Sequence, residues 1–199
     1  VSVLSVLFVS LLCWRNSPEL FRLLAAVPAQ VLDNEQYWRL LTALAVHSSW
    51  MHLLSNIPFL AFFSYLLYGY FGFWVYPIGV ILLSCLTNYL ALLTYSPEVH
   101  LVGASGMTYL MAGFWLTVYI LVERSLTLKK RLMRSLGVAL ILLLPSTLQH
   151  RVSYRTHVIG FTLGAVAAGV YFQNRKQWIR AAEVLEIVEE EDSSGHAVM

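Results

Sequence analysis

The chain has 199 residues, of which 58% are hydrophobic and 12% are charged, and its formal net charge is +2. A soluble domain usually has about a quarter of its residues charged. The composition therefore excludes an ordinary water-soluble protein and indicates one membrane domain that lipid partly covers. So small a net charge, without basic residues interleaved with aromatic ones, also argues against a nucleic-acid partner.

Apolar runs along the sequence predict an all-α membrane protein with a bundle of six spanning helices, because one span needs about 20 mainly apolar residues. A long amphipathic first loop, residues 15–46, follows the first run. Residues 1–172 form the expected membrane domain, and the charged stretch 173–199 is expected to be a partly disordered tail. The predicted runs are residues 1–14, about 50–68, about 73–95, about 103–122, about 135–148 and about 157–172.

The orientation of these helices is predicted from the basic residues of the short connections, since Lys and Arg favour the cytoplasmic side. The loop 123–134 and the C-terminal tail are both basic, so both are expected in the cytoplasm. The long first loop and the loops 96–102 and 149–156 then face the opposite side. The basic residues concerned are Arg124, Lys129, Lys130, Arg131, Arg134, Arg175, Lys176 and Arg180.

Several polar residues lie inside or at the ends of the apolar runs. An unpaired polar group in hydrocarbon costs several kcal/mol, so each is expected to be paired or to line a water-filled cavity. Ionisable residues in such places are candidates for function, although a single Asn or Ser more often only bonds a neighbouring helix. These residues are His47, His52, Asn56, Asn88, Ser105 and His157.

The spacing of these residues favours a catalytic site. His52 and Asn56 are four residues apart and share one face of a helix. Ser105 lies in Gly103-Ala104-Ser105-Gly106 at the start of a run, where free N–H groups and the positive end of the helix dipole can stabilise an anion. His157 is followed by Gly160 and Gly164, small residues that allow two helices to approach closely.

A serine nucleophile needs a base, and histidine is the usual one. The only acidic residues between Gln36 and the sixth run are Glu98 and Glu123, both in or next to loops. The sequence can therefore build at most a Ser105–His157 dyad. Tyr109, one turn after Ser105, is the candidate to orient the imidazole.

Four separated motifs together resemble those of the rhomboid family of intramembrane serine proteases, over about residues 38–168. Each one falls in the expected order and on the expected helix or loop. They are Gly103-Ala104-Ser105-Gly106 for G-x-S-G, residues 157–164 for H-x-x-G-x-x-x-G, residues 52–56 for H-x-x-x-N, and the pair Trp38-Arg39.

The resemblance implies a role for each site residue. Ser105 is the expected nucleophile and His157 the expected base. His52 and Asn56 are expected to form an oxyanion hole with the amide of Ser105, and Tyr109 to stack on His157. The expected supporting residues are Gly103, Gly106, Gly160 and Gly164.

The resemblance also implies the setting of the reaction. It predicts no cofactor and no metal, substrates that are single-pass transmembrane proteins, and a multi-pass protein of the bacterial inner membrane. Phe63-Ser64 and Leu67 stand roughly where the family has Gly-Gly and Glu, and Pro58 follows Asn56 closely, so a divergent branch is expected.

Two other functions compete with the protease. The first is a catalytically inactive rhomboid-like adaptor that binds transmembrane helices. The second is a metal or proton site made by His47, His52, His100 and His157. The spacing disfavours the metal site. Two histidines on one helix usually bind a metal when they are four residues apart, whereas His47 and His52 are five residues apart. His47 and His100 are instead expected at the outer membrane boundary, and His47 is expected to matter less than His52.

Overall fold

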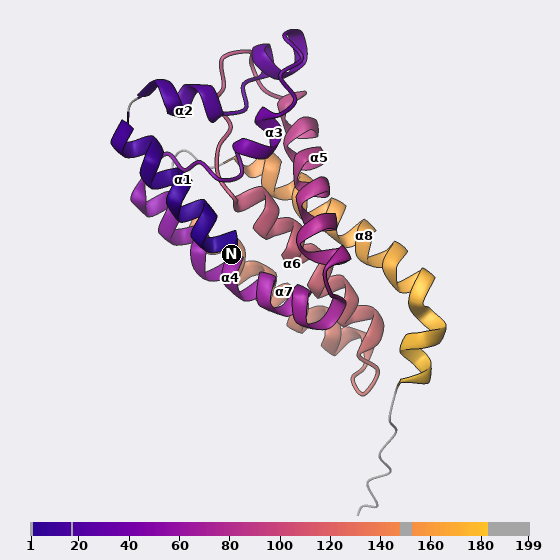
Figure 1. The fold of residues 1–199 in the computed structure, drawn as a ribbon. Coiled ribbons are helices and arrows are strands. Elements are labelled where there is room, and N and C mark those ends of the chain that lie inside the picture. Colours follow the sequence, from indigo (N-terminus) through magenta and orange to yellow (C-terminus); the bar gives the residue numbers. More distant parts are fainter. Residues whose placement is uncertain (1, 17, 148–152, 183–199) are drawn as a thin grey trace, which may run out of the picture.

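The computed structural model describes residues 2–16, 18–147 and 153–182. Within these ranges the chain is a set of helices joined by loops, and its only β pairing is the isolated bridge between Ala26 and Leu101 (Figure 1). The helices are α1 (Ser2–Asn16), α2 (Pro18–Leu24), the short π-helix η1 (Ala29–Asp33), α3 (Arg39–Thr42), α4 (Trp50–Phe71), the π-helix η2 (Trp74–Gly79), α5 (Val80–Leu92), α6 (Ser105–Val122), α7 (Leu128–Thr147) and α8 (Tyr154–Ala181).

Three of these helical stretches are long and apolar enough to cross a membrane among the described residues: Trp50–Phe71, Trp74–Leu92 and Ser105–Val122. The apolar part of α1, Val3–Trp14, is shorter. The all-α membrane fold is therefore confirmed. The count of six spans remains a prediction, because α7 and α8 combine an apolar stretch with several charged residues.

Two helix boundaries differ from those predicted. Helix α7 begins at Leu128 rather than near Ser135, so much of the expected 123–134 loop is helical. Helix α8 continues to Ala181, so the first part of the expected tail is also helical. Lys, Arg and Gln are good helix formers, so a change from apolar to basic residues does not end a helix. Residues 148–152 and 183–199 of the expected loop and tail lie outside the described part of the chain.

Helix α6 lies at the centre of the bundle and packs against α4, α5, α7 and α8. Its contact with α8 is backbone against backbone at glycines. A Cβ atom added to Gly160 would lie 2.5 Å from the carbonyl oxygen of Gly106, and one added to Gly164 would collide with that of Leu110. A third glycine, Gly113 on α6, faces the carbonyl of Phe161 in the same way. Small residues thus let the N-terminal halves of α6 and α8 come together.

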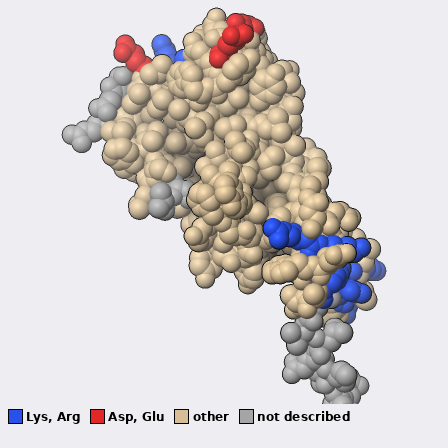
Figure 2. Space-filling view, turned by 45° about the vertical axis from the view of Figure 1, so that its right-hand side comes forward, with Lys and Arg blue, Asp and Glu red and all other residues tan. Residues whose placement is uncertain are grey.

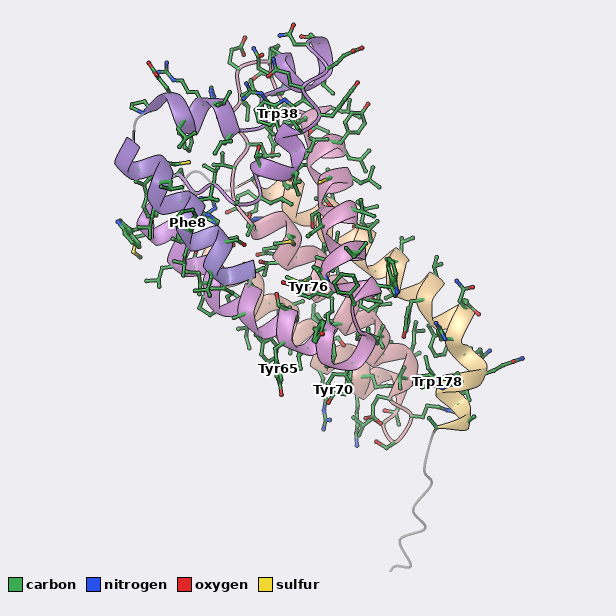
Figure 3. All side chains as sticks on the ribbon, in the orientation of Figure 1. Phe8, Trp38, Tyr65, Tyr70, Tyr76 and Trp178 are labelled. Atoms are coloured by element: carbon green, nitrogen blue, oxygen red, sulfur yellow. The ribbon has the colours of Figure 1, made fainter. Side chains whose placement is uncertain are left out.

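The first loop is an ordered segment at one end of the bundle, where Figure 3 labels Trp38. The buried Arg39 organises it: its Nε donates to Gln36 Oε1 at 2.6 Å, and its Nη1 donates to the carbonyl oxygens of Arg22 at 2.8 Å and Ala25 at 3.1 Å. Asn88 Nδ2 of α5 donates to Leu40 O at 3.0 Å and ties the segment to the bundle.

The middle of α4 combines buried apolar side chains with one paired polar group. Phe63 and Leu67 are buried in the core. Ser64 Oγ donates to Tyr76 Oη of η2 at 2.6 Å, so this polar group is paired within the bundle. Apolar packing and one side-chain hydrogen bond thus hold this part of α4 against the bundle.

Candidate active site

Ser105 is the first residue of α6 and follows a tightly held loop. Gly103 has φ +114°, a conformation that favours glycine, and its N–H donates to Ala43 O at 2.9 Å. Ala104 and Gly106 on either side are buried, whereas Ser105 itself is partly exposed. The loop therefore presents this hydroxyl at the N-terminus of the central helix.

His157 lies in the first turn of α8 and is 3% exposed. Its ring stacks on Tyr109 with the centroids 4.1 Å apart and the planes 7° from parallel. Tyr109 stands one turn beyond Ser105 on α6. Beside this stack, a Cβ atom added to Gly106 would lie 2.8 Å from Thr156 Cγ2. The imidazole is therefore held against Tyr109 of α6, one helical turn from Ser105.

Both ring nitrogens of His157 are buried and have no hydrogen-bond partner among the described residues. The hydrogen bond that would join Ser105 to His157 is therefore not formed in this structure. Buried polar atoms without partners are rare in folded proteins. Catalytic hydrogen bonds are often long without substrate and shorten on binding, so an unpaired imidazole stacked on Tyr109 fits a site that completes its bonds during reaction.

His52 approaches the loop before Ser105 from α4. Its ring lies so close to Gly103 that a Cβ atom there would be 2.6 Å from Cε1 and 2.8 Å from Nε2. Its Nδ1 lies 3.2 Å from Ser48 Oγ. If the hydroxyl donates to Nδ1, the neutral ring carries its hydrogen on Nε2, the nitrogen on the Gly103 side. His52 can then act as a donor at this loop.

Asn56 lies one turn after His52 and is 6% exposed. Its Nδ2 donates to the carbonyl oxygen of His52 at 2.8 Å. An amide nitrogen has two hydrogens, so this bond within the helix leaves the second one available. The bond also fixes the amide against the helix turn that carries His52.

His47 belongs to a hydrogen-bond chain that the sequence did not indicate. Its Nε2 accepts the N–H of Ala104 at 3.3 Å, and its Nδ1 lies 3.2 Å from Ser10 Oγ, which donates to Ala45 O at 2.9 Å. Because Nε2 accepts, the neutral ring carries its hydrogen on Nδ1 and donates to Ser10. His47 thus links α1 to the residue before Ser105.

The surroundings of His47 keep it neutral. The residue is 0% exposed, and burial, followed by the nearby His52, lowers its pKa to about 3. It precedes α4, which begins at Trp50. The expectation that His47 matters less than His52 remains a prediction, and the structure adds that His47 contacts the loop before Ser105.

The four histidines of the alternative metal site do not form one cluster among the described residues. The rings of His47 and His52 meet edge to face at 4.9 Å, but both nitrogens of His47 take part in the hydrogen-bond chain with Ala104 and Ser10. His100 Nδ1 instead lies 2.9 Å from the carbonyl oxygen of Glu98. The part of the chain that the structure describes holds no group of three or more His, Cys, Asp or Glu arranged to bind a metal.

Comparison with protein families matches residues 34–174 to the family model described as the rhomboid domain. The chain belongs to the rhomboid family. The match covers more than half of this rhomboid and includes all the motifs from Trp38 to Gly164. A comparison with curated proteins finds no match.

Reasoning from sequence missed Ser10 and the role of His47 in this rhomboid. A serine in the apolar first run was the one available signal for Ser10. Its partners lie 35 and 37 residues away in the chain, and His47 lies 57 residues from Ala104. No local periodicity connects positions so far apart.

Proposed function

We propose that this rhomboid is an intramembrane serine endopeptidase that hydrolyses peptide bonds in or near transmembrane segments of membrane proteins. Ser105 is the nucleophile and His157 the general base. The observation that best supports the proposal is the stack of His157 on Tyr109. It holds a buried imidazole, with both nitrogens unpaired among the described residues, against a side chain one helical turn from Ser105.

The proposed reaction has two halves. Ser105 Oγ attacks the scissile carbonyl carbon while His157 takes the hydroxyl proton. The tetrahedral intermediate then collapses, the C–N bond breaks, and the leaving amine takes the proton from His157. In the second half, water attacks the acyl ester, its proton passes through His157 back to Ser105 Oγ, and the carboxylic acid product leaves.

The negative charge of the tetrahedral oxygen needs donors that are already in place. We assign this role to the backbone N–H of Ser105, to His52 Nε2 and to the second amide hydrogen of Asn56. The contact of the His52 ring with Gly103 supports the assignment, because Gly103 lies only two residues before Ser105. The start of α6 adds the positive end of a helix dipole.

The proposal extends to substrate and orientation. Single-pass membrane proteins are the proposed substrates, since the candidate site lies at the end of an apolar helix bundle. The opposite end of the bundle carries the Lys and Arg residues of 124–134 and of the end of α8. These residues support an orientation in which this basic end lies in the cytoplasm and the candidate site faces the other side. In a bacterium, the membrane is the inner one.

Labelling with a fluorophosphonate separates the protease from an inactive adaptor. We expect the detergent-solubilised protein to be labelled at Ser105, because an activated serine attacks the phosphorus and an ordinary serine does not. Intact-protein mass spectrometry measures the adduct, and Ser105→Ala should not form it. A folded wild-type protein that resists labelling and cleaves no transmembrane substrate would favour the adaptor.

Loss of an oxyanion donor is expected to slow turnover strongly. His52→Ala and Asn56→Ala should each lower kcat by about 10²–10³, the usual effect of removing one positioned donor. His100→Ala is the matched control, because its ring is exposed and contacts the Glu98 carbonyl oxygen and the ring of Phe21. Cleavage of a transmembrane substrate in vesicles measures all three, and equal rates for His52→Ala and His100→Ala would refute the assignment.

His47→Ala is expected to impair both stability and cleavage. It leaves the buried N–H of Ala104 without an acceptor, which costs about 1–3 kcal/mol, and it frees the loop that presents Ser105. His47→Gln can restore an acceptor at a similar reach and should recover part of the rate. If His47→Ala retains the wild-type rate and melting temperature, the hydrogen-bond chain through Ser10 has no role in holding Ser105.

A further inference from the structure

The end of the bundle opposite the first loop carries a basic surface. It is made by the 123–127 loop, the first turns of α7 and the last turns of α8, and we call it the basic end. Figure 2 shows Lys and Arg gathered there, while the visible Asp and Glu lie at the other end. Its exposed cations are Arg124, Lys129, Lys130, Arg134, Arg175 and Lys176.

Only one carboxylate belongs to these segments within the described residues. Glu123 accepts hydrogen bonds from the N–H and the hydroxyl of Ser125, at 2.8 Å and 2.5 Å, so it is engaged within its own loop. Those bonds, and further the nearby Arg131 and Arg134, lower its pKa. The surface therefore keeps a large excess of positive charge at neutral pH.

Two other arginines fix the shape of the basic end. Arg131 of α7 donates to the carbonyl oxygen of Ile120 at 2.5 Å, and Arg180 of α8 donates to that of Leu121 at 3.3 Å. Arg180 also lies over the ring of Phe172 at 5.5 Å. Neighbouring carbonyl oxygens at the end of α6 thus accept hydrogen bonds from both α7 and α8. These bonds hold the end of α6, the start of α7 and the end of α8 together.

Exposed apolar side chains are interleaved with the cations of the basic end. Leu128, Leu132, Met133 and Leu136 project from the same stretch of α7 as Lys129, Lys130 and Arg134, and Trp178 projects from α8. Figure 3 places Tyr65, Tyr70 and Trp178 at this end, where exposed aromatic rings are typical of the boundary between hydrocarbon and headgroups. The occupant of this surface must therefore offer both negative charge and hydrocarbon.

We propose that the basic end is a binding site for anionic phospholipid, with the phosphate at the exposed Lys and Arg side chains and the acyl chains against the apolar side chains of α7. Clusters of Lys and Arg next to a spanning helix attract anionic headgroups. The segment 183–192 of the same chain also contains both acidic and apolar residues, so it is the competing occupant that the experiment has to separate from lipid. A phospholipid meets both requirements.

Native mass spectrometry can test the site on the full-length protein in a neutral detergent. The probe is an equimolar mixture of phosphatidylglycerol and phosphatidylcholine with identical acyl chains, and the measurement is the ratio of the two bound lipids. We expect phosphatidylglycerol to be preferred, with the preference falling as salt is added. The combined variant Lys129→Gln, Lys130→Gln and Arg134→Gln should weaken phosphatidylglycerol binding on the order of 100-fold, at roughly fivefold for each cation.

Two further variants decide what the charge does. Lys129→Arg, Lys130→Arg and Arg134→Lys together keep the charge and should keep the preference, which separates a lost site from a damaged fold. Neutralising residues 189–192 should leave the preference unchanged. The proposal is overturned if the glutamine variant prefers phosphatidylglycerol as strongly as the parent, or if a preference arises only after the acidic stretch is neutralised. The ratio of bound lipids does not depend on catalysis. The lipid-binding proposal can therefore be correct even if the protein is not a protease.

Discussion

Ser105→Ala, His157→Ala and the double variant are expected to lose cleavage to about the same extent, on the order of 10⁶ in kcat, because a nucleophile and its base act as one unit and their losses do not add. Cleavage of a single-pass substrate in vesicles, followed to long times, measures the residual rates. All three variants should be extracted in detergent as folded protein, since Ser105 is partly exposed and both nitrogens of His157 lack partners among the described residues.

Two controls separate chemistry from packing. Tyr109→Phe keeps the ring that lies on His157 and should retain much of the rate, whereas Tyr109→Ala should lose most of it because the imidazole loses its orientation. Ser125→Ala, at an exposed loop position far from α8's first turn in sequence, should cleave as the parent does. Substantial cleavage by Ser105→Ala would exclude the proposed nucleophile.

The fold was predictable where apolar runs are long and clearly bounded. The expected run 103–122 compares with Ser105–Val122 for α6, and the expected run 50–68 compares with Trp50–Phe71 for α4. Both helices begin at polar or glycine-containing loops and are mainly apolar. Hydropathy alone therefore places them to within a few residues.

Prediction was weaker where a helix leaves the apolar region without a breaker. Helix α7 starts among Lys129, Lys130 and Arg131, and α8 passes through Arg175 and Lys176. The stems of Lys and Arg are apolar and their heads can reach water, so the backbone continues while hydropathy falls. Hydropathy reports the surrounding medium, whereas the hydrogen-bonded helix depends on backbone preference.

At the candidate site, local spacing was informative and long-range pairing was not. The interval between Ser105 and Tyr109 puts them on one face of α6, and the glycines after His157 indicate a close helix contact. The bond between His47 and Ala104, and that between Asn88 and Leu40, join elements distant in sequence. Their partners follow from how the first loop and the helices pack, which one sequence does not specify.

The close contact between α6 and α8 is expected to make Gly164 the glycine least tolerant of substitution. Gly164→Ala places a methyl group on the carbonyl of Leu110 and near the backbone nitrogen of Phe114, both in the central helix. Neither backbone atom can rotate away, so the helices must separate. We expect unfolding free energy to fall by about 1–3 kcal/mol, and further for Gly164→Val. Cleavage should fall as well, because the shift moves His157 relative to Ser105.

Gly169→Ala is the matched control on the same helix, because a Cβ atom there would meet nothing within 4 Å. Alanine is favoured over glycine in a helix by about 1 kcal/mol, so this variant should be as stable as the parent or slightly more so. Thermal unfolding in detergent and the cleavage rate in vesicles measure both variants. Gly164→Ala could instead have the same melting temperature as Gly169→Ala and cleave at the parent rate. In that case the backbone contact between α6 and α8 does not hold His157 in place, and the stack on Tyr109 alone must orient the ring.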